Sequence, residues 1–405
     1  MGSMAIKKAP RVLMFGWELP PHNSGGLGVA CYGITKGLSA LGVPISFAMP
    51  RKLPTSTPFM DVVTPWLPGV KFTALNSLLQ AYLIKHRYQV LLSATKEKEQ
   101  YGISLYEEAL RFGRLAGFWA MTQKHNLIHA HDWMTFPAAM QAAKHSRKPW
   151  IAHVHATEFD RTGGYLDKRI AEIEYEGLHK ADQVIAVSGY EKEMVIKHYG
   201  VPRSHIAVVH NGIDMLEFQP MDLRRVFPHD KIVLLVCRLT FQKGVDYLLK
   251  AAKRVLDREP NTIFVIAGSG DMEQRLIMQA AYMGIGQRII FTGFVTGEKL
   301  KMLYSMADLF IMPSVSEPYG LVALEAIASG TPTIISKQSG VGETLPSVFK
   351  VDFWDTDLMA DQMVYLLSHP DQARDVTRKA RGEAEKRSWN QAASEVLSVY
   401  HHMYS

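Results

Sequence analysis

The sequence predicts an α/β protein built from two Rossmann-like domains with parallel sheets, and three observations carry that prediction. Short apolar stretches of strand size alternate with stretches of helical periodicity along most of the chain. The alternation begins afresh after a polar segment that contains Pro220 and Pro228. The length of 405 residues is two to three times the common domain size, so each half is long enough to bury its own core.

The first half opens with a strand, a glycine-rich turn, a helix and a second strand, which together form a strand–helix–strand unit. Later strands end in turn or polar residues in the same way, with helices between them, as a parallel sheet requires. The less regular segment 51–87 is expected to be a loop with one helix near 74–84. The expected strands are 12–16, 44–49, 127–131, 150–155, 183–187 and 206–209, and the expected helices are 29–41, 105–122 and 170–179.

At 208–214 a strand runs into a turn, and we place the domain boundary there. We predict domains at 4–215 and 216–385, with 386–405 as a C-terminal helix that packs back on the first domain. Ligands of such sheets bind beyond the carboxyl ends of the strands, so the loops after these ends should face a cleft between the domains. The second half should contain strands at 232–238, 262–267, 288–292, 309–312 and 332–336, and helices at 244–258, 271–283, 297–306 and 321–329.

The composition describes an ordinary globular protein, with 47% hydrophobic and 21% charged residues. It excludes intrinsic disorder and collagen-like repeats. No apolar run approaches the roughly 18 residues needed to cross a bilayer. We interpret residues 1–3 as an expression remnant before the natural Met4, find no signal peptide after it, and expect a cytoplasmic protein. Cys31 and Cys237 lie far apart in apolar segments, which favours buried thiols over a disulfide or a zinc cluster.

The net charge of +6 is concentrated in the first half, where residues 1–215 hold 24 Lys and Arg against 17 Asp and Glu. The basic residues are scattered and are not interleaved with aromatic residues in a stripe. We therefore expect no nucleic-acid partner. Peripheral contact with a membrane stays open but is not favoured.

The most informative motif is 317–326, directly after a predicted strand and at the start of a helix. The amides of Gly320, Leu321 and Val322 would be first-turn donors at the positive end of the helix dipole, which suits a diphosphate. Glu325, one turn further on, can accept hydrogen bonds from both hydroxyls of a ribose, and Glu317 can touch the other end of the ligand. The alternative makes Glu317 a solvated loop residue and Glu325 part of an exposed helix face.

This motif resembles the paired-glutamate signature of retaining nucleotide-sugar glycosyltransferases with the GT-B fold, in particular glycosyltransferase family 4. The resemblance implies that 4–215 is the acceptor-side domain and 216–385 the nucleotide-sugar donor domain. It extends over nearly the whole chain. The other matching segments are 24–28, 129–133, 208–214, 237–239, 243–244, 267–270 and 339–343.

The resemblance also implies roles for single residues around the reaction. Arg238 and Lys243 correspond to the family's pair of phosphate-binding cations, although a carboxylate partner or a solvated face is an alternative for either. His155 corresponds to the histidine whose ring lies against the donor sugar and whose carbonyl borders the reacting centre. His153, two residues earlier in the strand, is expected to be a hydrogen-bonded core histidine.

The remaining assignments follow the same resemblance. The donor should contact Gly25 and Gly26, whose backbone can approach it closely, together with Gly268, Phe294 and Val295. The acceptor should contact Asp132, Trp133, Glu158 and Arg161, although a mutual ion pair is an alternative for the last two.

No metal is expected at the reacting phosphate, because the two cations and the helix amides take its place. Asp355 and Asp357 imitate a metal-binding Asp-x-Asp motif but are expected to be structural.

We predict a retaining glycosyltransferase that moves a hexosyl unit, glucose first, from a nucleoside diphosphate sugar to an acceptor hydroxyl. The nucleotide sugar is a co-substrate, and no cofactor is expected. An α-1,4-glucan acceptor is suggested by similarity to glycogen and starch synthases. The sequence departs from those synthases at Ser24, where they have lysine, and at Glu325, which they usually lack.

Four alternatives remain open at this stage. They are a family 4 enzyme with a lipid-linked or small-molecule acceptor, a GT-B-fold sugar-nucleotide epimerase, a non-catalytic binding module and a dehydrogenase. The dehydrogenase is disfavoured because the glycines at 26 and 28 lack the third glycine of the dinucleotide fingerprint. The strand ending at Met49 also lacks the acidic residue that would bind an NAD ribose.

Overall fold

The computed structural model describes residues 9–16, 25–49, 70–74, 104–221 and 229–403. The position of Ser24 and, except for Ala74, the helix expected near 74–84 lie outside these residues. Within the segment 51–87, which was expected to be a loop, the structure has a strand at Val70–Ala74. The chain divides into two compact units. Unit 1 comprises Met1–Glu158, Leu166–Gly212 and Trp389–Ser405, and unit 2 comprises Phe159–Tyr165 and Ile213–Ser388.

Unit 1 contains a seven-stranded parallel sheet in the order β3-β2-β1-β4-β5-β6-β7. Apart from the last strand, this is the strand order of doubly wound dinucleotide-binding folds, and the winding direction reverses between β1 and β4. The strands are β1 (Val12–Phe15), β2 (Ile45–Met49), β3 (Val70–Ala74), β4 (Leu127–His131), β5 (Trp150–Val154), β6 (Gln183–Ala186) and β7 (Ile206–Val208).

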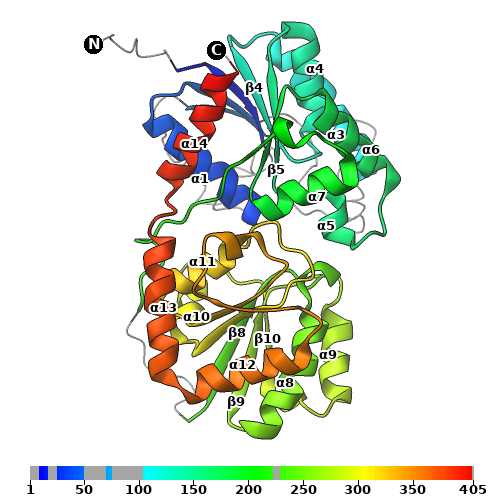
Figure 1. Cartoon of the computed structure of the whole chain (residues 1–405). Coiled ribbons are helices and arrows are strands. Elements are labelled where there is room, and N and C mark those ends of the chain that lie inside the picture. Colours follow the sequence, from blue (N-terminus) through cyan, green and yellow to red (C-terminus); the bar gives the residue numbers. More distant parts are fainter. Residues whose placement is uncertain (1–8, 17–24, 50–69, 75–103, 222–228, 404–405) are drawn as a thin grey trace, which may run out of the picture. The chain divides into compact units, whose positions relative to one another are not determined.

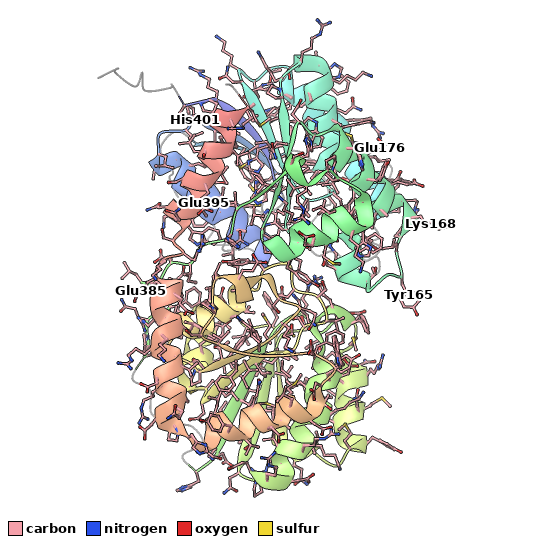
Figure 2. The ribbon with its side chains drawn as sticks, viewed as in Figure 1. Tyr165, Lys168, Glu176, Glu385, Glu395 and His401 are labelled. Atoms are coloured by element: carbon pink, nitrogen blue, oxygen red, sulfur yellow. The ribbon has the colours of Figure 1, made fainter. Side chains whose placement is uncertain are left out.

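The helices of unit 1 pack on this sheet with an apolar side inward. On α6, for example, Ile173 and Leu178 are buried, whereas Lys168 and Glu176 project outward (Figure 2). The helices are α1 (Gly26–Ala40), α3 (Leu105–Ala120), α4 (Phe136–Ser146), α6 (Lys168–Lys180), α7 (Gly189–Tyr199) and α14 (Trp389–His402), with a 3-10 turn η2 (Arg203–His205). The short helix α5 (Glu158–Thr162) begins at the last residue of a unit 1 segment, and its other residues belong to unit 2.

The last helix of the chain lies beside the first one. In Figure 1, α14 (red) runs along α1 (blue), although they are separated by almost the whole sequence. The Trp389 indole covers Gly33 so closely that a Cβ there would stand 2.1 Å from the ring. Residues 389–402 are therefore an integral part of unit 1.

Unit 2 contains a six-stranded parallel sheet in the order β10-β9-β8-β11-β12-β13. This repeats the doubly wound order, with the reversal between β8 and β11. The strands are β8 (Lys231–Val236), β9 (Thr262–Ala267), β10 (Ile289–Gly293), β11 (Leu309–Met312), β12 (Thr333–Ser336) and β13 (Phe349–Val351).

The core of unit 2 lies between this sheet and its helices. Leu235 and Ile266 of the central strands pack with Leu248 and Leu249 of α8 in one buried cluster. Strands buried on both faces read as continuous apolar runs, which is why the sequence revealed them. The helices are α8 (Val245–Arg258), α9 (Glu273–Tyr282), α10 (Gly297–Met306), α11 (Leu321–Ala328), α12 (Thr356–Ser368) and α13 (Pro370–Ala384), with 3-10 turns η3 (Phe241–Lys243), η4 (Gly286–Arg288) and η5 (Gly340–Glu343).

Both cysteines are free thiols, Cys31 buried and Cys237 half-buried. Among the residues that the structure describes, no helix is long and apolar enough to cross a membrane.

Candidate active site

In unit 2 the two cations expected at the phosphates lie with Glu317 where the strand order reverses. Arg238 and Lys243 follow β8, and Ser314 and Glu317 follow the adjacent β11. Gly244 makes the approach of the two loops possible. Its φ is +64°, and a Cβ at this position would stand 2.0 Å from the Pro313 carbonyl oxygen. Only glycine permits this approach.

Lys243 and Glu317 form a largely buried ion pair. The Lys243 Nζ donates to Glu317 Oε2 at 2.7 Å, and Ser314 Oγ donates to the same oxygen at 2.9 Å. The two charged side chains are 17% and 11% exposed. The carboxylate partner weighed as an alternative for Lys243 is therefore present, and Glu317 is not a solvated loop residue. An anionic ligand here would meet an ammonium that is already desolvated and held in place.

The backbone around Glu317 is fixed by the loop after β12. The Glu317 amide donates to the Gln338 carbonyl, and the Gly340 amide donates to the Glu317 carbonyl, both at 2.9 Å. Next to it, Ser316 Oγ donates to Asp160 Oδ1 at 2.5 Å. This contact joins segment 159–165 to unit 2, a connection that the predicted boundaries did not include.

The helix α11 begins with the amides expected to bind a diphosphate. Its N-cap is Gly320, with φ at +112°, and no side chain caps the first turn. Among the described residues, none accepts a hydrogen bond from the amides of Gly320, Leu321 or Val322. These three donors therefore lie at the positive end of the helix dipole with capacity for an anion.

Glu325 lies on the second turn of α11 and is buried, with 8% of its surface exposed. The Tyr304 hydroxyl of α10 donates to its Oε2 at 2.8 Å. Burial, opposed by the Tyr304 hydrogen bond and assisted by the charge of Glu217, raises the pKa of Glu325 to about 7. The alternative of an exposed helix face is excluded.

We expect a Glu325→Gln protein to gain stability over the parent as the pH rises. Because folding raises the pKa of this carboxyl from its usual 4.5 to about 7, its stabilising contribution is complete below pH 4.5 and is lost as the pH passes 7. The difference between the two proteins should change by about 3 kcal/mol between pH 4.5 and 8. Urea unfolding of both proteins at these pH values measures it.

The matched control is Glu298→Gln, because Glu298 is a 72% exposed glutamate of the neighbouring helix α10. Its substitution should leave the pH dependence of unfolding unchanged. A Glu325→Gln protein whose urea midpoint ran parallel to that of the parent at every pH would contradict the expectation.

Gly268, Phe294 and Val295 lie at the carboxyl edge of the other half of this sheet. Gly268 follows β9 with φ at +146°, and a Cβ there would stand 1.7 Å from the Cys237 carbonyl oxygen. Backbone packing alone therefore requires this glycine. Phe294 follows β10 and is 61% exposed, so its ring is available for stacking.

In unit 1 the loops after β4 and β5 are joined through Asp132. Its φ is +59°, its amide donates to the His153 carbonyl at 3.0 Å, and its Oδ1 accepts from the His155 amide at 2.7 Å. Asp132 is 7% exposed and Trp133 is 4% exposed. The carboxylate expected at the acceptor thus holds the backbone of His155, a role that the sequence analysis did not foresee.

The other residues expected near the acceptor and donor are placed as follows. Glu158 is buried, its amide donates to the Glu174 carboxylate at 3.0 Å, and its Oε1 accepts from the Asp167 amide at 3.2 Å. Arg161 is partly exposed on α5. Gly25 is the N-cap of α1 and Gly26 its first residue, and no acidic side chain lies in that first turn.

Four histidines of β4, β5 and the residue after β5 form a cluster, which we call the histidine quartet: the buried His129, His131 and His153, and the partly exposed His155. Their rings stack in pairs, with centroids 4.4 Å apart for His129 and His131 and for His153 and His155. His131 Nδ1 is 2.9 Å from His155 Nε2, and His129 Nε2 is 3.1 Å from His153 Nδ1. His153 is thus the hydrogen-bonded core residue that was expected.

The quartet is neutral. Burial lowers the pKa of His129 and of His155 to about 3, and it lowers the pKa of His131 and His153 well below the usual value. Repulsion between neighbouring rings adds to the effect for all except His155. The histidine ring predicted at the donor sugar is therefore uncharged.

Two groups of side chains in the described part of unit 1 have spacing that could hold a metal ion. They are Cys31, His131 and His155, and His129, His131 and His153, each with ligand atoms within 4.8 Å of one another. The ring–ring hydrogen bonds occupy one ring nitrogen of each of these histidines, whereas Nε2 of His131 and of His153 has no hydrogen-bond partner among the described residues.

The Asp-x-Asp motif of unit 2 has local partners. Asp355 caps α12 by accepting from the Leu358 amide at 3.0 Å, and Asp357 pairs with Arg254.

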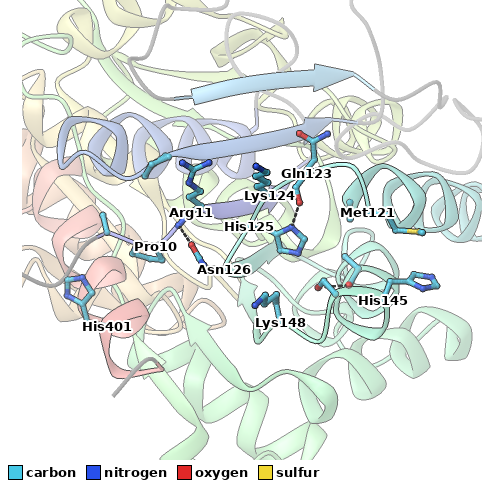
Figure 3. Close-up of a pocket in the computed structure, with 15 residues that line it drawn as sticks. Pro10, Arg11, Met121, Gln123, Lys124, His125, Asn126, His145, Lys148 and His401 are labelled. Carbon is cyan, nitrogen blue, oxygen red and sulfur yellow. Dashed lines mark hydrogen bonds between the residues drawn. The ribbon is translucent and has the colours of Figure 1, made fainter.

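A cavity of about 1150 Å³ lies elsewhere in unit 1 (Figure 3). Its lining residues Arg11, Asn126 and Lys148 precede β1, β4 and β5, so it opens at the amino-terminal ends of the strands. It is therefore at the edge of the sheet opposite to His131 and His155.

The comparisons with known proteins agree with these two units. Residues 98–215 match the family described as Glycosyltransferase Family 4, and residues 224–383 match Glycosyl transferases group 1. An uncharacterized glycosyltransferase of Methanocaldococcus jannaschii is 32% identical over 408 residues, which cover 96% of this chain and 97% of the relative. A glycogen synthase of Mycobacterium tuberculosis is 30% identical over 342 residues, 83% of this chain and 80% of the relative.

The fold has solved counterparts as well. The Anabaena HepE protein, solved in complex with UDP and glucose, has a TM-score of 0.73 at 16% identity, with coverage of 97% and 100%. The chain is an α/β protein with the GT-B fold, as predicted. It belongs to the family 4 type of glycosyltransferases and is a glycosyltransferase enzyme.

Proposed function

We propose that the enzyme transfers a hexosyl unit, glucose first, from a nucleoside diphosphate sugar to an acceptor hydroxyl with retention of configuration, and that the acceptor is an α-1,4-glucan. The observation that carries this proposal is the Lys243–Glu317 pair beside the open amides of α11 at the reversal of strand order in unit 2. The similarity to a glycogen synthase supports the glucan, and the likeness to a protein that binds UDP and glucose supports the donor.

In this proposal unit 2 binds the nucleotide. Arg238, Lys243 and the first amides of α11 bind the diphosphate, which would spread its charge over two cations and a helix dipole. Glu325 accepts from the ribose hydroxyls, and Phe294 with Val295 borders the base. Glu317 holds the Lys243 ammonium in position and touches the sugar.

Unit 1 supplies the groups for the sugar and the acceptor. His155 contacts the donor sugar, with its amide held by Asp132, and the backbone at Gly25 and Gly26 approaches the donor. The loops that carry Trp133 and Glu158 border the acceptor. Arg161, which belongs to unit 2, offers a charged side chain to the acceptor hydroxyls.

The proposed reaction is a front-face displacement. The bond between the anomeric carbon and the phosphate oxygen breaks, the acceptor oxygen bonds to the same carbon on the same face, and the acceptor proton passes to the departing phosphate. No protein base is needed, which fits the neutral state of His155. Lys243, Arg238 and the α11 amides stabilise the charge that develops on the phosphate, so we propose that no metal takes part.

A product assay tests the proposal. Purified protein is incubated with UDP-glucose or ADP-glucose, with and without glycogen, in the presence of EDTA. We expect a lengthened glucan from one of the two donors and undiminished activity in EDTA, because cations of the chain already face the phosphate.

Other outcomes point elsewhere. An epimerised nucleotide sugar would indicate an epimerase, and transfer only to lipid-linked or small acceptors would replace the glucan. Strict dependence on magnesium or manganese that disappears when Asp355 and Asp357 are replaced would show that this motif holds a metal.

A further inference from the structure

The histidine quartet contains two ring nitrogens without a partner. The Nε2 atoms of His131 and His153 are buried, and no described residue accepts from them or donates to them. In each of these rings the other nitrogen, Nδ1, makes the ring–ring hydrogen bond. A neutral imidazole carries a single N–H proton. In each ring this proton is therefore either on the bonded nitrogen or on the unpartnered one.

This arrangement allows two tautomers for His131, and they differ in what is left unpaired. If His131 accepted at Nδ1, its proton would be on Nε2, and a buried N–H would point at no acceptor. If His131 donates from Nδ1, only a lone pair is left at Nε2. Buried N–H groups without an acceptor are rarer in folded proteins than under-used acceptors, so the second tautomer is favoured.

We propose that His131 is a positioning residue, which donates its Nδ1–H to Nε2 of His155 and thereby fixes the His155 proton on Nδ1. His155 then presents an N–H donor, and not a lone pair, on its remaining nitrogen. The catalytic consequence rests on the proposed function, because the group that receives this N–H would be an oxygen of the donor sugar.

The same preference for a paired N–H fixes the tautomers of His153 and His129. His153 donates from Nδ1 to Nε2 of His129, so the His129 proton is on Nδ1. That nitrogen is 2.6 Å from the Tyr400 hydroxyl and donates to it. All four rings of the quartet thus carry their proton on Nδ1, and the second chain of bonds ties α14 to the sheet.

The electrostatics agree with a fixed neutral quartet. A charged imidazolium would carry protons on both nitrogens and would place two N–H groups against each other in the ring–ring bonds. Burial lowers the pKa of every member, which keeps one proton on each ring. The Asp132 carboxylate meanwhile binds the backbone amide of His155, so the residue is held at its amide and at its ring.

The first test reads the tautomers directly. The full-length protein is labelled with ¹⁵N-histidine, and the ring nitrogens are observed by long-range proton–nitrogen correlation at neutral pH. Resonances of His131 and His155 are assigned by their loss in the His131→Asn and His155→Asn proteins. We expect a protonated Nδ1 and an unprotonated Nε2 in both rings. A protonated Nε2 in either ring overturns the proposal.

The second test compares two substitutions of His131. An asparagine amide can stand near the position of the ring Nδ1 and donate, whereas leucine has similar bulk and no donor. In His131→Leu nothing fixes the His155 proton, so we expect both His155 tautomers to be populated and kcat/KM for the nucleotide sugar to fall about 10- to 100-fold, as for the loss of other partners that orient a site residue. His131→Asn should keep the tautomer and most of the activity.

The matched control is His153→Leu. His153 is equally buried, pairs with His131 in the sheet register and stacks on His155 at 4.4 Å, but it bonds to His129. Its loss should leave the His155 tautomer unchanged. An unchanged His155 tautomer in His131→Leu, or equal activity losses in His131→Leu and His131→Asn, would overturn the positioning role.

If the His131 variants do not fold, the wild-type spectrum still decides the hydrogen-bond assignment through the His155 resonances, which the His155→Asn protein identifies. It also separates the two proposals. Protonated Nδ1 atoms in a protein that transfers no sugar would refute the proposed function and leave the assignment standing.

Discussion

We expect the Lys243→Ala protein to turn over at about one hundredth of the wild-type rate or less. Its side chain is 17% exposed and is held by Glu317. In the proposed function it would therefore act on the phosphate from a largely water-free position. Removing such a preorganised charge costs about 3 kcal/mol of transition-state stabilisation, or roughly 10²-fold in kcat. Steady-state kinetics with saturating donor measure the loss, and Arg238→Ala should behave in the same direction.

The substitution also leaves the Glu317 carboxylate buried without its cation. Breaking a buried pair in this way costs about 3–5 kcal/mol of stability, so lost activity could reflect unfolding. The double variant Lys243→Ala/Glu317→Gln separates the two effects, because the neutral amide needs no cation. We expect it to recover stability but not turnover.

Lys337→Ala is the matched control. Lys337 forms a 2.8 Å ion pair with Asp352 in the same unit, but its side chain is 53% exposed. An exposed pair contributes little, so stability and turnover should both stay near those of the parent. Wild-type turnover in both the Lys243→Ala and Arg238→Ala proteins would remove these residues from the site.

The second large effect is expected at Gly268. We expect Gly268→Ala to lose about 4 kcal/mol or more of stability, enough to unfold many domains. Its φ of +146° is unfavourable for alanine, and the added Cβ would stand 1.7 Å from the carbonyl oxygen of Cys237. Gly268 and Cys237 directly follow the paired strands β9 and β8, so neither residue can move without disturbing the sheet. Urea unfolding of the purified protein, or its failure to fold at all, measures the effect.

Gly284→Ala provides the comparison. Gly284 has a φ of +72°, but an added Cβ would meet nothing within 4 Å. Its substitution should cost only the backbone strain, about 1–2 kcal/mol. Similar losses of stability in Gly268→Ala and Gly284→Ala would show that the loop after β9 can move to accommodate the added Cβ. A further consequence is that lost activity in Gly268→Ala would not test whether this residue binds the donor.

Much of the fold could be predicted because each parallel strand is buried on both faces. The expected strand at 309–312 and the expected helix at 297–306 have the bounds of β11 and α10. Most other ends differ by one or two residues, as for α8, which starts at Val245 and not at 244. Strand ends are harder to place because polar site residues begin there.

The ion pair of unit 2 could not be predicted from the sequence. Lys243 and Glu317 are 74 residues apart, and they meet only because β8 and β11 are neighbours in the sheet. The sequence showed that both follow strands, but not that those two strands adjoin. It therefore assigned the two residues to separate ends of the ligand.

The sequence could predict which histidines of the quartet share a face, but not which rings form hydrogen bonds. Alternation within each strand places His129 with His131 and His153 with His155 on one face. Which rings bond depends on the pairing of β4 with β5, in which His131 is opposite His153 and yet bonds to His155. That diagonal contact depends on ring orientation, which no sequence pattern specifies.

The position of α14 beside α1 has a consequence for how the chain folds during its synthesis. The ribosome delivers Trp389–Ser405 only after the whole of Ile213–Ser388. Unit 2 thus has all its strands available first, while the unit that was begun earlier still lacks the Trp389 ring over Gly33 and the Tyr400 hydroxyl at His129. Unit 1 is thus begun first but completed last. Until α14 emerges, the face of α1 that it covers is open to contact with other apolar surfaces.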